Sequence, residues 1–141
     1  MKTADLTKLE LLEAWYEDDP AMRVTVTFPF FAATGNKTSS VVYFEIEPGR
    51  YLGTHTDSAE EILLILSGSV EASLGAEKGQ LSAGQAALIP EMVSHGVRNV
   101  GQETARCVGF FSAANVVSTF DQPMMPFGQQ AVGTPPTEAT V

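Results

Sequence analysis

Two stretches decide the fold: GRYLGTHTDSAEEILLILSG at residues 49–68 and GQAALIPEMVSHGVRN at residues 84–99. Each contains one of the only two histidines in the chain, His55 and His95. Residues two apart on a strand face the same side, so His55 and Asp57 can point the same way, and Glu61 has the same parity. We therefore expect His55, Asp57 and Glu61 to meet His95, from another strand, inside a β structure.

Two imidazoles and one or two carboxylates from neighbouring strands form a compact ligand set for a metal ion. A 2-His-1-carboxylate face with open positions suits Fe(II) and oxygen chemistry. We predict one divalent ion on His55, Asp57, Glu61 and His95, with Fe(II) favoured and Mn, Ni, Zn or Cu as alternatives. A second interpretation stays open: the same side chains could lie on a solvated rim and bind no metal.

The spacings also carry a resemblance to a known family. The first stretch has Gly49, five residues, His55, one residue, Asp57, three residues, Glu61, six residues and Gly68. The second has Gly84, five residues, Pro90, one residue, Met92, two residues, His95, three residues and Asn99. These resemble the two signature motifs of the cupin superfamily at every spacing. Asp57 stands where the family has a second histidine, and Met92 where it has a glycine.

The resemblance implies an all-β fold, a double-stranded β-helix or jelly-roll barrel, with one metal ion inside and pairing of two chains as a homodimer. Three functions follow as expectations. The first is a dioxygenase-like enzyme that oxidises a small, partly apolar substrate chelated to the metal, with Glu61 or Asp57 as general base. The second is a redox-neutral lyase, isomerase or cyclase that uses the ion as a Lewis acid. The third is a non-catalytic barrel that binds a small molecule.

The pattern along the rest of the chain agrees with a barrel. About eight short runs with apolar alternation or β-branched residues are separated by turn signals, which is typical of a sandwich or barrel. Residues 1–20 predict a short helical segment, since Thr7 and Glu10 resemble a capping box. We assign residues 21–120 to the barrel and residues 121–141, rich in proline and glycine, to a loose tail whose methionines and Phe127 could cover an apolar opening.

Some aromatic and polar residues are candidates for a substrate pocket. One member of each pair Tyr43–Phe44 and Phe110–Phe111 should face the barrel interior. Proximity to His95 along the chain favours Met92, although core packing explains this residue about as well. Arg106 lies eleven residues after His95, similar to where 2-oxoglutarate oxygenases, which share the HxD…H triad and a jelly-roll core, place a basic residue, although a solvated strand position explains it better. The predicted pocket residues are Met92, Tyr43, Phe110 and Arg106.

Composition limits the partners. The net charge is −9, with 17 acidic and 8 basic residues, and nucleic acids and anionic membranes both need basic patches. The N-terminus lacks the pattern of a signal peptide, and the clearest aliphatic run, residues 62–66, is far too short to span a bilayer. We expect a cytoplasmic protein with a small-molecule substrate and no nucleic-acid or membrane partner.

Overall fold

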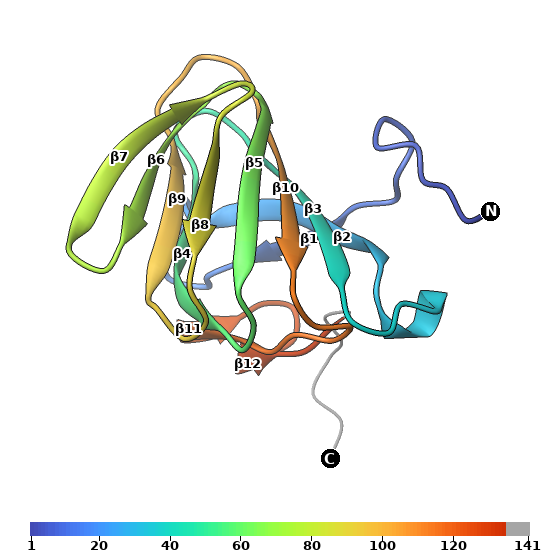
Figure 1. Cartoon of the computed structure of the whole chain (residues 1–141). Coiled ribbons are helices and arrows are strands. Elements are labelled where there is room, and N and C mark those ends of the chain that lie inside the picture. Colours follow the sequence, from blue (N-terminus) through green and yellow to red (C-terminus); the bar gives the residue numbers. More distant parts are fainter. Residues whose placement is uncertain (135–141) are drawn as a thin grey trace.

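Strands make up nearly all the regular structure in the computed structural model, which describes residues 1–134. They form two six-stranded sheets that face each other as a jelly-roll barrel (Figure 1), and all pairings between named strands are antiparallel. The first sheet contains, in spatial order, β1 (Leu12–Trp15), β2 (Arg23–Phe30), β3 (Ser40–Ile46), β10 (Ala105–Phe111), β5 (Glu61–Ser67) and β8 (Ala86–Ile89). The second contains β12 (Gln129–Val132), β11 (Ser118–Met124), β4 (Tyr51–Asp57), β9 (His95–Asn99), β6 (Ser69–Leu74) and β7 (Glu77–Ser82). The predicted all-β jelly roll is confirmed.

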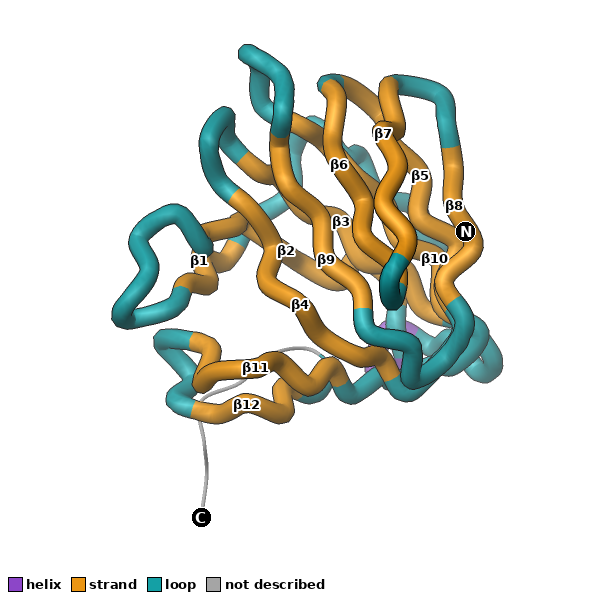
Figure 2. Tube along the Cα trace, turned by 90° about the vertical axis from the view of Figure 1, so that its left-hand side faces the viewer, coloured by secondary structure: helices purple, strands orange, loops and turns teal. Residues whose placement is uncertain are grey.

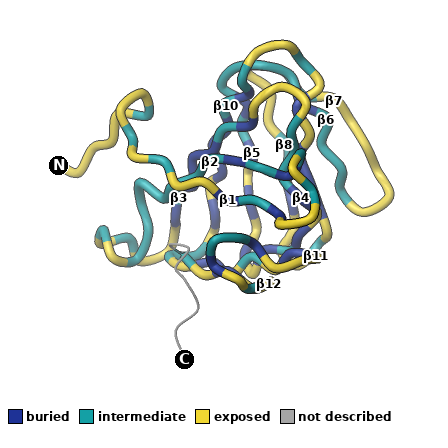
Figure 3. The backbone as a smooth tube through the Cα atoms, turned by 180° about the vertical axis from the view of Figure 1, so that it is seen from behind, coloured by how far each residue is buried: buried dark blue, intermediate teal, exposed yellow. Residues whose placement is uncertain are grey.

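Alternating side chains give each sheet an apolar inner face. On β3, Val42 and Phe44 line the interior cavity, and Phe111 of β10 does the same. The structure thereby selects Phe44 and Phe111, one member of each aromatic pair, as the inward residues. Burial follows this pattern along the strands, whereas β7 and the N-terminal segment are largely exposed (Figure 3).

The hairpin of β11 and β12 closes the side of the barrel between the two sheets. It lies beside β4 (Figure 2), where Ser118 pairs with Asp57 and Phe120 with His55. On its other side, Trp15 and Met125 exchange two backbone hydrogen bonds of 3.1 and 2.8 Å. The hairpin therefore links the β1 edge of one sheet to the β4 side of the other, next to the predicted metal ligands.

The predicted N-terminal helix is wrong. Within residues 1–20 the chain makes a turn, in which the Asp5 carboxylate accepts hydrogen bonds from the amide and hydroxyl of Thr7, and then forms β1. Thr7 thus bonds back to Asp5 and does not cap a helix. Isolated short helices are marginal, and pairing of Leu12 with Val26 and of Ala14 with Val24 gives this segment a sheet in its place.

The prediction of a loose tail from residue 121 is also wrong as far as residue 134. Residue 121 lies inside β11, and β12 follows it. Val132 is buried, and the Thr134 hydroxyl donates to the Val116 carbonyl at 2.6 Å and accepts from its amide at 2.8 Å. Cross-strand pairing and burial outweigh the turn-forming composition here. The rest of the predicted tail, residues 135–141, lies outside the described residues.

Helix is nearly absent from the part of the chain that the structure describes. It is limited there to a three-residue 3-10 turn, η1 (Ala32–Thr34). Within residues 1–134, no helix has the length and apolar character needed to cross a membrane.

Candidate metal centre

Four buried polar side chains converge at one place inside the barrel. His55 and Asp57 come from the end of β4, and His95 begins β9, directly opposite His55 in the antiparallel register. Glu61 begins β5 in the facing sheet. All four predicted ligands are at most 6% exposed, which removes the alternative of a solvated rim.

Each histidine is oriented by a backbone carbonyl. His55 Nδ1 lies 2.7 Å from the Gly53 carbonyl, and His95 Nδ1 lies 2.9 Å from the Val93 carbonyl. A carbonyl can only accept, so each Nδ1 carries the proton, and in the neutral ring Nε2 keeps a free lone pair. Metal-binding histidines are characteristically held in this way.

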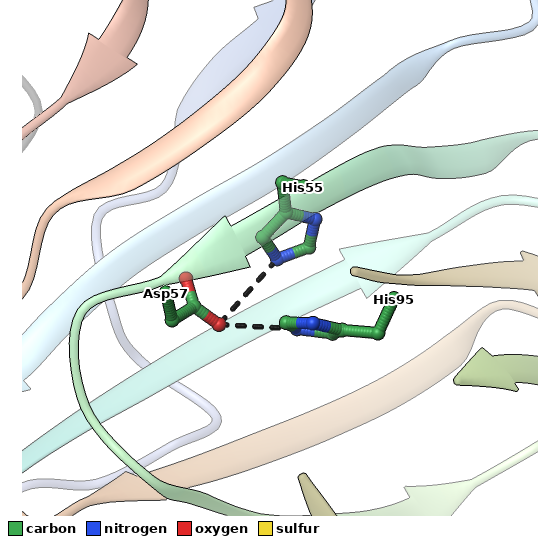
Figure 4. Close-up of side chains that lie close together, drawn as sticks. All are labelled: His55, Asp57 and His95. Carbon is green, nitrogen blue, oxygen red and sulfur yellow. Dashed lines mark ion pairs between the residues drawn. The ribbon is translucent and has the colours of Figure 1, made fainter. Parts of the chain in front are cut away.

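The free atoms point toward one another. One ligand atom each from His55, Asp57 and His95 can be chosen so that all three lie within 4.8 Å of one another. Asp57 Oδ2 lies 3.6 Å from His55 Nε2 and 3.0 Å from His95 Nε2 (Figure 4). Although close, Asp57 Oδ2 and His95 Nε2 do not meet the geometry of a hydrogen bond, and both are buried without a hydrogen-bond partner. Two unpartnered buried polar atoms are costly, and a cation between them would satisfy both. The donor set therefore fits a divalent metal.

Glu61 lies beside this three-residue group. Its Oε1 is 3.6 Å from His95 Nε2, but the group that satisfies the mutual distance is His55, Asp57 and His95. A Cβ on Gly109 would lie 2.1 Å from Glu61 Oε2, so the carboxylate occupies the space that a side chain at residue 109 would fill. Coordination by Glu61 as a fourth ligand stays a prediction.

Asp57 is held from a distant part of the chain. The Ser118 hydroxyl of β11 donates a 2.5 Å hydrogen bond to Asp57 Oδ1, leaving Oδ2 for the metal position. The Phe120 ring stacks on the His55 ring, with centroids 4.6 Å apart and 24° between the planes. Neither residue was predicted from the sequence, because a serine and a phenylalanine after the second motif carry no spacing signal.

The pKa values of all four groups are shifted from their ordinary values. Burial lowers the pKa of His55 to about 4. Burial also acts to lower the pKa of His95, but the neighbouring carboxylates of Asp57 and Glu61 outweigh it and raise the pKa to about 10. For Asp57 the opposing effect of burial is outweighed by the two histidines, and its pKa falls. Burial and the Asp57 charge raise the pKa of Glu61. In the metal-free site His95 therefore carries a proton in the place that a cation would take.

An apolar cavity adjoins the centre. It measures about 80 Å³, as the room open to the centre of a water-sized sphere. The four clustered residues and Ser118 are its polar lining side chains. The rest of the lining is glycine or apolar: Ala14, Val24, Val26, Phe28, Val42, Phe44, Leu52, Leu63, Val97, Phe111, Phe120, Met124, Phe127, Val132 and Gly133.

The four residues predicted for a substrate pocket lie elsewhere. Met92 is 61% exposed in the turn before β9, and Phe110 is 45% exposed on the outer face of β10. Arg106 donates to the Tyr43 hydroxyl at 2.7 Å, and both line a shallow surface depression under the N-terminal segment. The strand parity that brings Phe44 and Phe111 inward turns Tyr43 and Phe110 outward. None of the four residues predicted for a substrate pocket lines this cavity.

Comparison with known proteins identifies the family of this fold. The family model described as "Cupin domain" matches residues 42–111, which include both motifs. Solved structures similar to this chain include an oxalate decarboxylase from Lactobacillus farciminis (20% identity, TM-score 0.63, 74% of this chain and 31% of that one). An oxalate decarboxylase from Bacillus subtilis is similar as well (21%, 0.56, 65% and 25%).

A third similar structure is the Cnp3 cupin domain from Schizosaccharomyces pombe, at 13% identity and a TM-score of 0.65, covering 79% of this chain and 73% of that one. The chain thus spans about a quarter to a third of the two oxalate decarboxylases. Among the curated proteins no sequence matches. The matched family model, the two motifs and the antiparallel barrel together show that this chain is a small cupin, a member of the cupin superfamily.

Proposed function

We propose that this cupin is a metal-dependent enzyme that oxidises a small, partly apolar organic molecule with oxygen. The observation that carries the proposal is the buried His55–Asp57–His95 group, whose ligand atoms lie within 4.8 Å of one another beside an apolar cavity. Two nitrogen donors and a carboxylate oxygen match the facial set that suits Fe(II), and this favours iron over the alternatives. A bound ion would polarise an enol, hydroxyl or carboxylate oxygen of the substrate and supply electron transfer to oxygen.

The protein's own contribution is positioning and exclusion of water. The Gly53 and Val93 carbonyls fix both imidazoles, and Ser118 fixes the Asp57 carboxylate. Glu61 lies beside the centre and can accept a proton from the substrate at its carboxylate. The apolar walls keep bulk water away from the reacting atoms, which strengthens each electrostatic interaction inside.

A redox-neutral lyase, isomerase or cyclase is the second candidate. The position of Glu61 favours it, because a carboxylate beside the three-residue group, and not within it, is free to move a proton while the ion stabilises an enolate. Oxygen consumption separates the two candidates: turnover without oxygen excludes the oxygenase, and turnover that stops without oxygen excludes the redox-neutral enzyme.

Elemental analysis of anaerobically purified protein tests the metal. We expect about one ion per chain in the wild type, and at least a roughly tenfold loss of affinity in His55→Ala and His95→Ala. Phe110→Ala, on the outer face, is the matched control and keeps its metal. Equal metal content in all four proteins would refute the site. Oxygen uptake is then screened with diketones, catechols and other chelating enols, and a barrel that binds ligand without turning it over would support a binding protein.

A further inference from the structure

Outside the cluster of His55, Asp57, Glu61 and His95, the walls of the cavity carry no charged side chain. Among the described residues that line it, the ionisable groups are His55, Asp57, Glu61 and His95, and the rest are apolar or small apart from Ser118. A negatively charged substrate would therefore meet two carboxylates and only the ion itself as a counter-charge. Burying an unpaired charge in such surroundings is costly.

The four arginines of the chain are all engaged outside the cavity. Arg23 pairs with Glu13 at 3.1 Å, and Arg50 donates to the Pro20 carbonyl at 3.2 Å. Arg98 lies over the Tyr51 ring and Arg106 over the Tyr43 ring. None of these side chains lines the cavity that the structure describes, so no guanidinium stands ready to bind a carboxylate or phosphate.

The size of the cavity sets a second limit. An apolar cavity of about 150 Å³ can hold benzene, and this cavity, at about 80 Å³, is smaller. It leaves room for a molecule of at most about one ring. A fused-ring compound with a further aromatic substituent would collide with the walls.

We infer that the substrate is a small neutral molecule, of about one ring, that presents two neighbouring oxygen atoms to the ion and apolar carbon to the walls. The inference rests on the proposed function for the metal and deepens it by naming the substrate class. It separates this protein from the similar oxalate decarboxylases, whose named substrate is a small acid.

The hairpin of β11 and β12 sets the length of the substrate. Met124, Phe127 and Val132 line the cavity from this hairpin, outside the stretch that the family model matches. Phe127 is 5% exposed and contributes the largest of the three side chains. Its removal should lengthen the cavity while leaving the four clustered polar residues in place.

The inference is tested with three ligands that carry the same chelating group. They are titrated into zinc-loaded protein, because zinc binds a ligand without redox turnover. Maltol is a neutral single-ring hydroxypyrone, comenic acid adds a carboxylate to that ring, and 3-hydroxyflavone adds fused and pendant rings. Titration calorimetry at neutral pH should show maltol binding at least about tenfold more tightly than either of the others. Equal or tighter binding of comenic acid overturns the charge limit, and equal or tighter binding of 3-hydroxyflavone overturns the size limit.

Substitutions in the cavity wall test whether the β11–β12 hairpin limits the size of the bound ligand. Phe127→Ala should improve binding of 3-hydroxyflavone by at least about tenfold, and Phe110→Ala, exposed on the outer face, should not change it. If Phe127→Ala does not fold, Val132→Ala serves the same purpose. No gain in either cavity variant, or the same gain in Phe110→Ala, overturns the role of the hairpin.

Zinc content, measured before any ligand is added, reports on the proposed function alone. Metal-free protein then tests the cavity by itself: toluene should raise the melting temperature and benzoate, a charged ring of similar size, should not. Stabilisation by benzoate equal to that by toluene overturns the inference whether or not the protein binds metal.

Discussion

At the scale of single residues, position 109 requires glycine because neighbouring side chains leave no room for a Cβ atom. A Cβ there would stand 2.1 Å from Glu61 Oε2 and 2.7 Å from Val42 Cγ1. We expect Gly109→Ala to destabilise the protein by about 1–3 kcal/mol through overpacking, measured by urea unfolding. Gly79→Ala is the matched control on β7, since a Cβ there meets nothing within 4 Å.

A double-mutant cycle tests whether the destabilisation caused by Gly109→Ala depends on Glu61. The Gly109→Ala cost should be smaller in a Glu61→Ala background, where the nearest clashing atom is gone and only the Val42 contact remains. An identical cost in both backgrounds would show that the carboxylate does not occupy this space.

The protonation states of the metal-free centre predict how metal binding depends on pH. The pKa of His95 is raised to about 10, so near neutral pH His95 is charged, whereas the pKa of His55, lowered to about 4, leaves that ring neutral. A metal needs the free Nε2 of both, so binding should release about one proton, from His95, and affinity should rise with pH up to about 10. Calorimetry in two buffers of different ionisation enthalpy measures the release, and binding without proton release would contradict it.

The raised pKa of His95 also makes the stability of the metal-free protein depend on pH. Because the folded pKa of His95 lies above its ordinary value of 6.5, its contribution to stability is fully present below pH 6.5 and is lost as pH rises to about 10. The His55 contribution has the opposite sign: it is present above pH 6.5 and lost as pH falls to about 4.

At the scale of elements, the β11–β12 hairpin both closes the barrel and orients the Asp57 carboxylate. Ser118 bonds Asp57 Oδ1, while its neighbour Thr119 is exposed. Ser118→Ala should lower metal affinity by about tenfold or more, because the carboxylate loses the contact that directs Oδ2. Thr119→Ala should leave affinity unchanged, and competition with a metal-sensitive chelating dye measures both. Equal metal affinity in the two variants would show that Ser118 has only a structural role and does not support metal binding.

At the scale of the whole molecule, the metal should couple to folding. Two unpartnered buried atoms and a cluster of ionisable groups weaken the metal-free barrel, and an ion that binds only the folded state stabilises it. At a free metal concentration about 100-fold above the dissociation constant the gain is about 2.7 kcal/mol, or about 8 °C in melting temperature. His55→Ala and His95→Ala should show no such rise in a thermal melt, and an equal rise in either variant would place the ion elsewhere.

Local spacing predicted much of this protein. The shared direction of His55 and Asp57 was readable because a strand alternates with a period of two. Glu61 and His95 lie on other strands and were identified from the spacing of the two motifs. The all-β barrel followed from short alternating runs and turns. The same reasoning could not choose between Tyr43 and Phe44 or between Phe110 and Phe111, since periodicity gives two faces without saying which is inside. Hence Tyr43 and Phe110 were predicted for the pocket although they lie on the outer face.

What the sequence by itself determined is therefore much of the strand pattern and the four side chains that converge inside the barrel, because the strand pattern depends on residues a few positions apart and the four side chains lie in two motifs of fixed spacing. Only the tertiary structure decided that residues 12–15 join a sheet, that Ser118 holds Asp57, and that β11 and β12 wall the cavity. Some of these contacts join distant residues: the Ser118–Asp57 pair is 61 positions apart, and the Trp15–Met125 pair is further apart still. Such pairings are chosen by competition for burial and hydrogen bonds across the whole fold, which no local window of sequence contains.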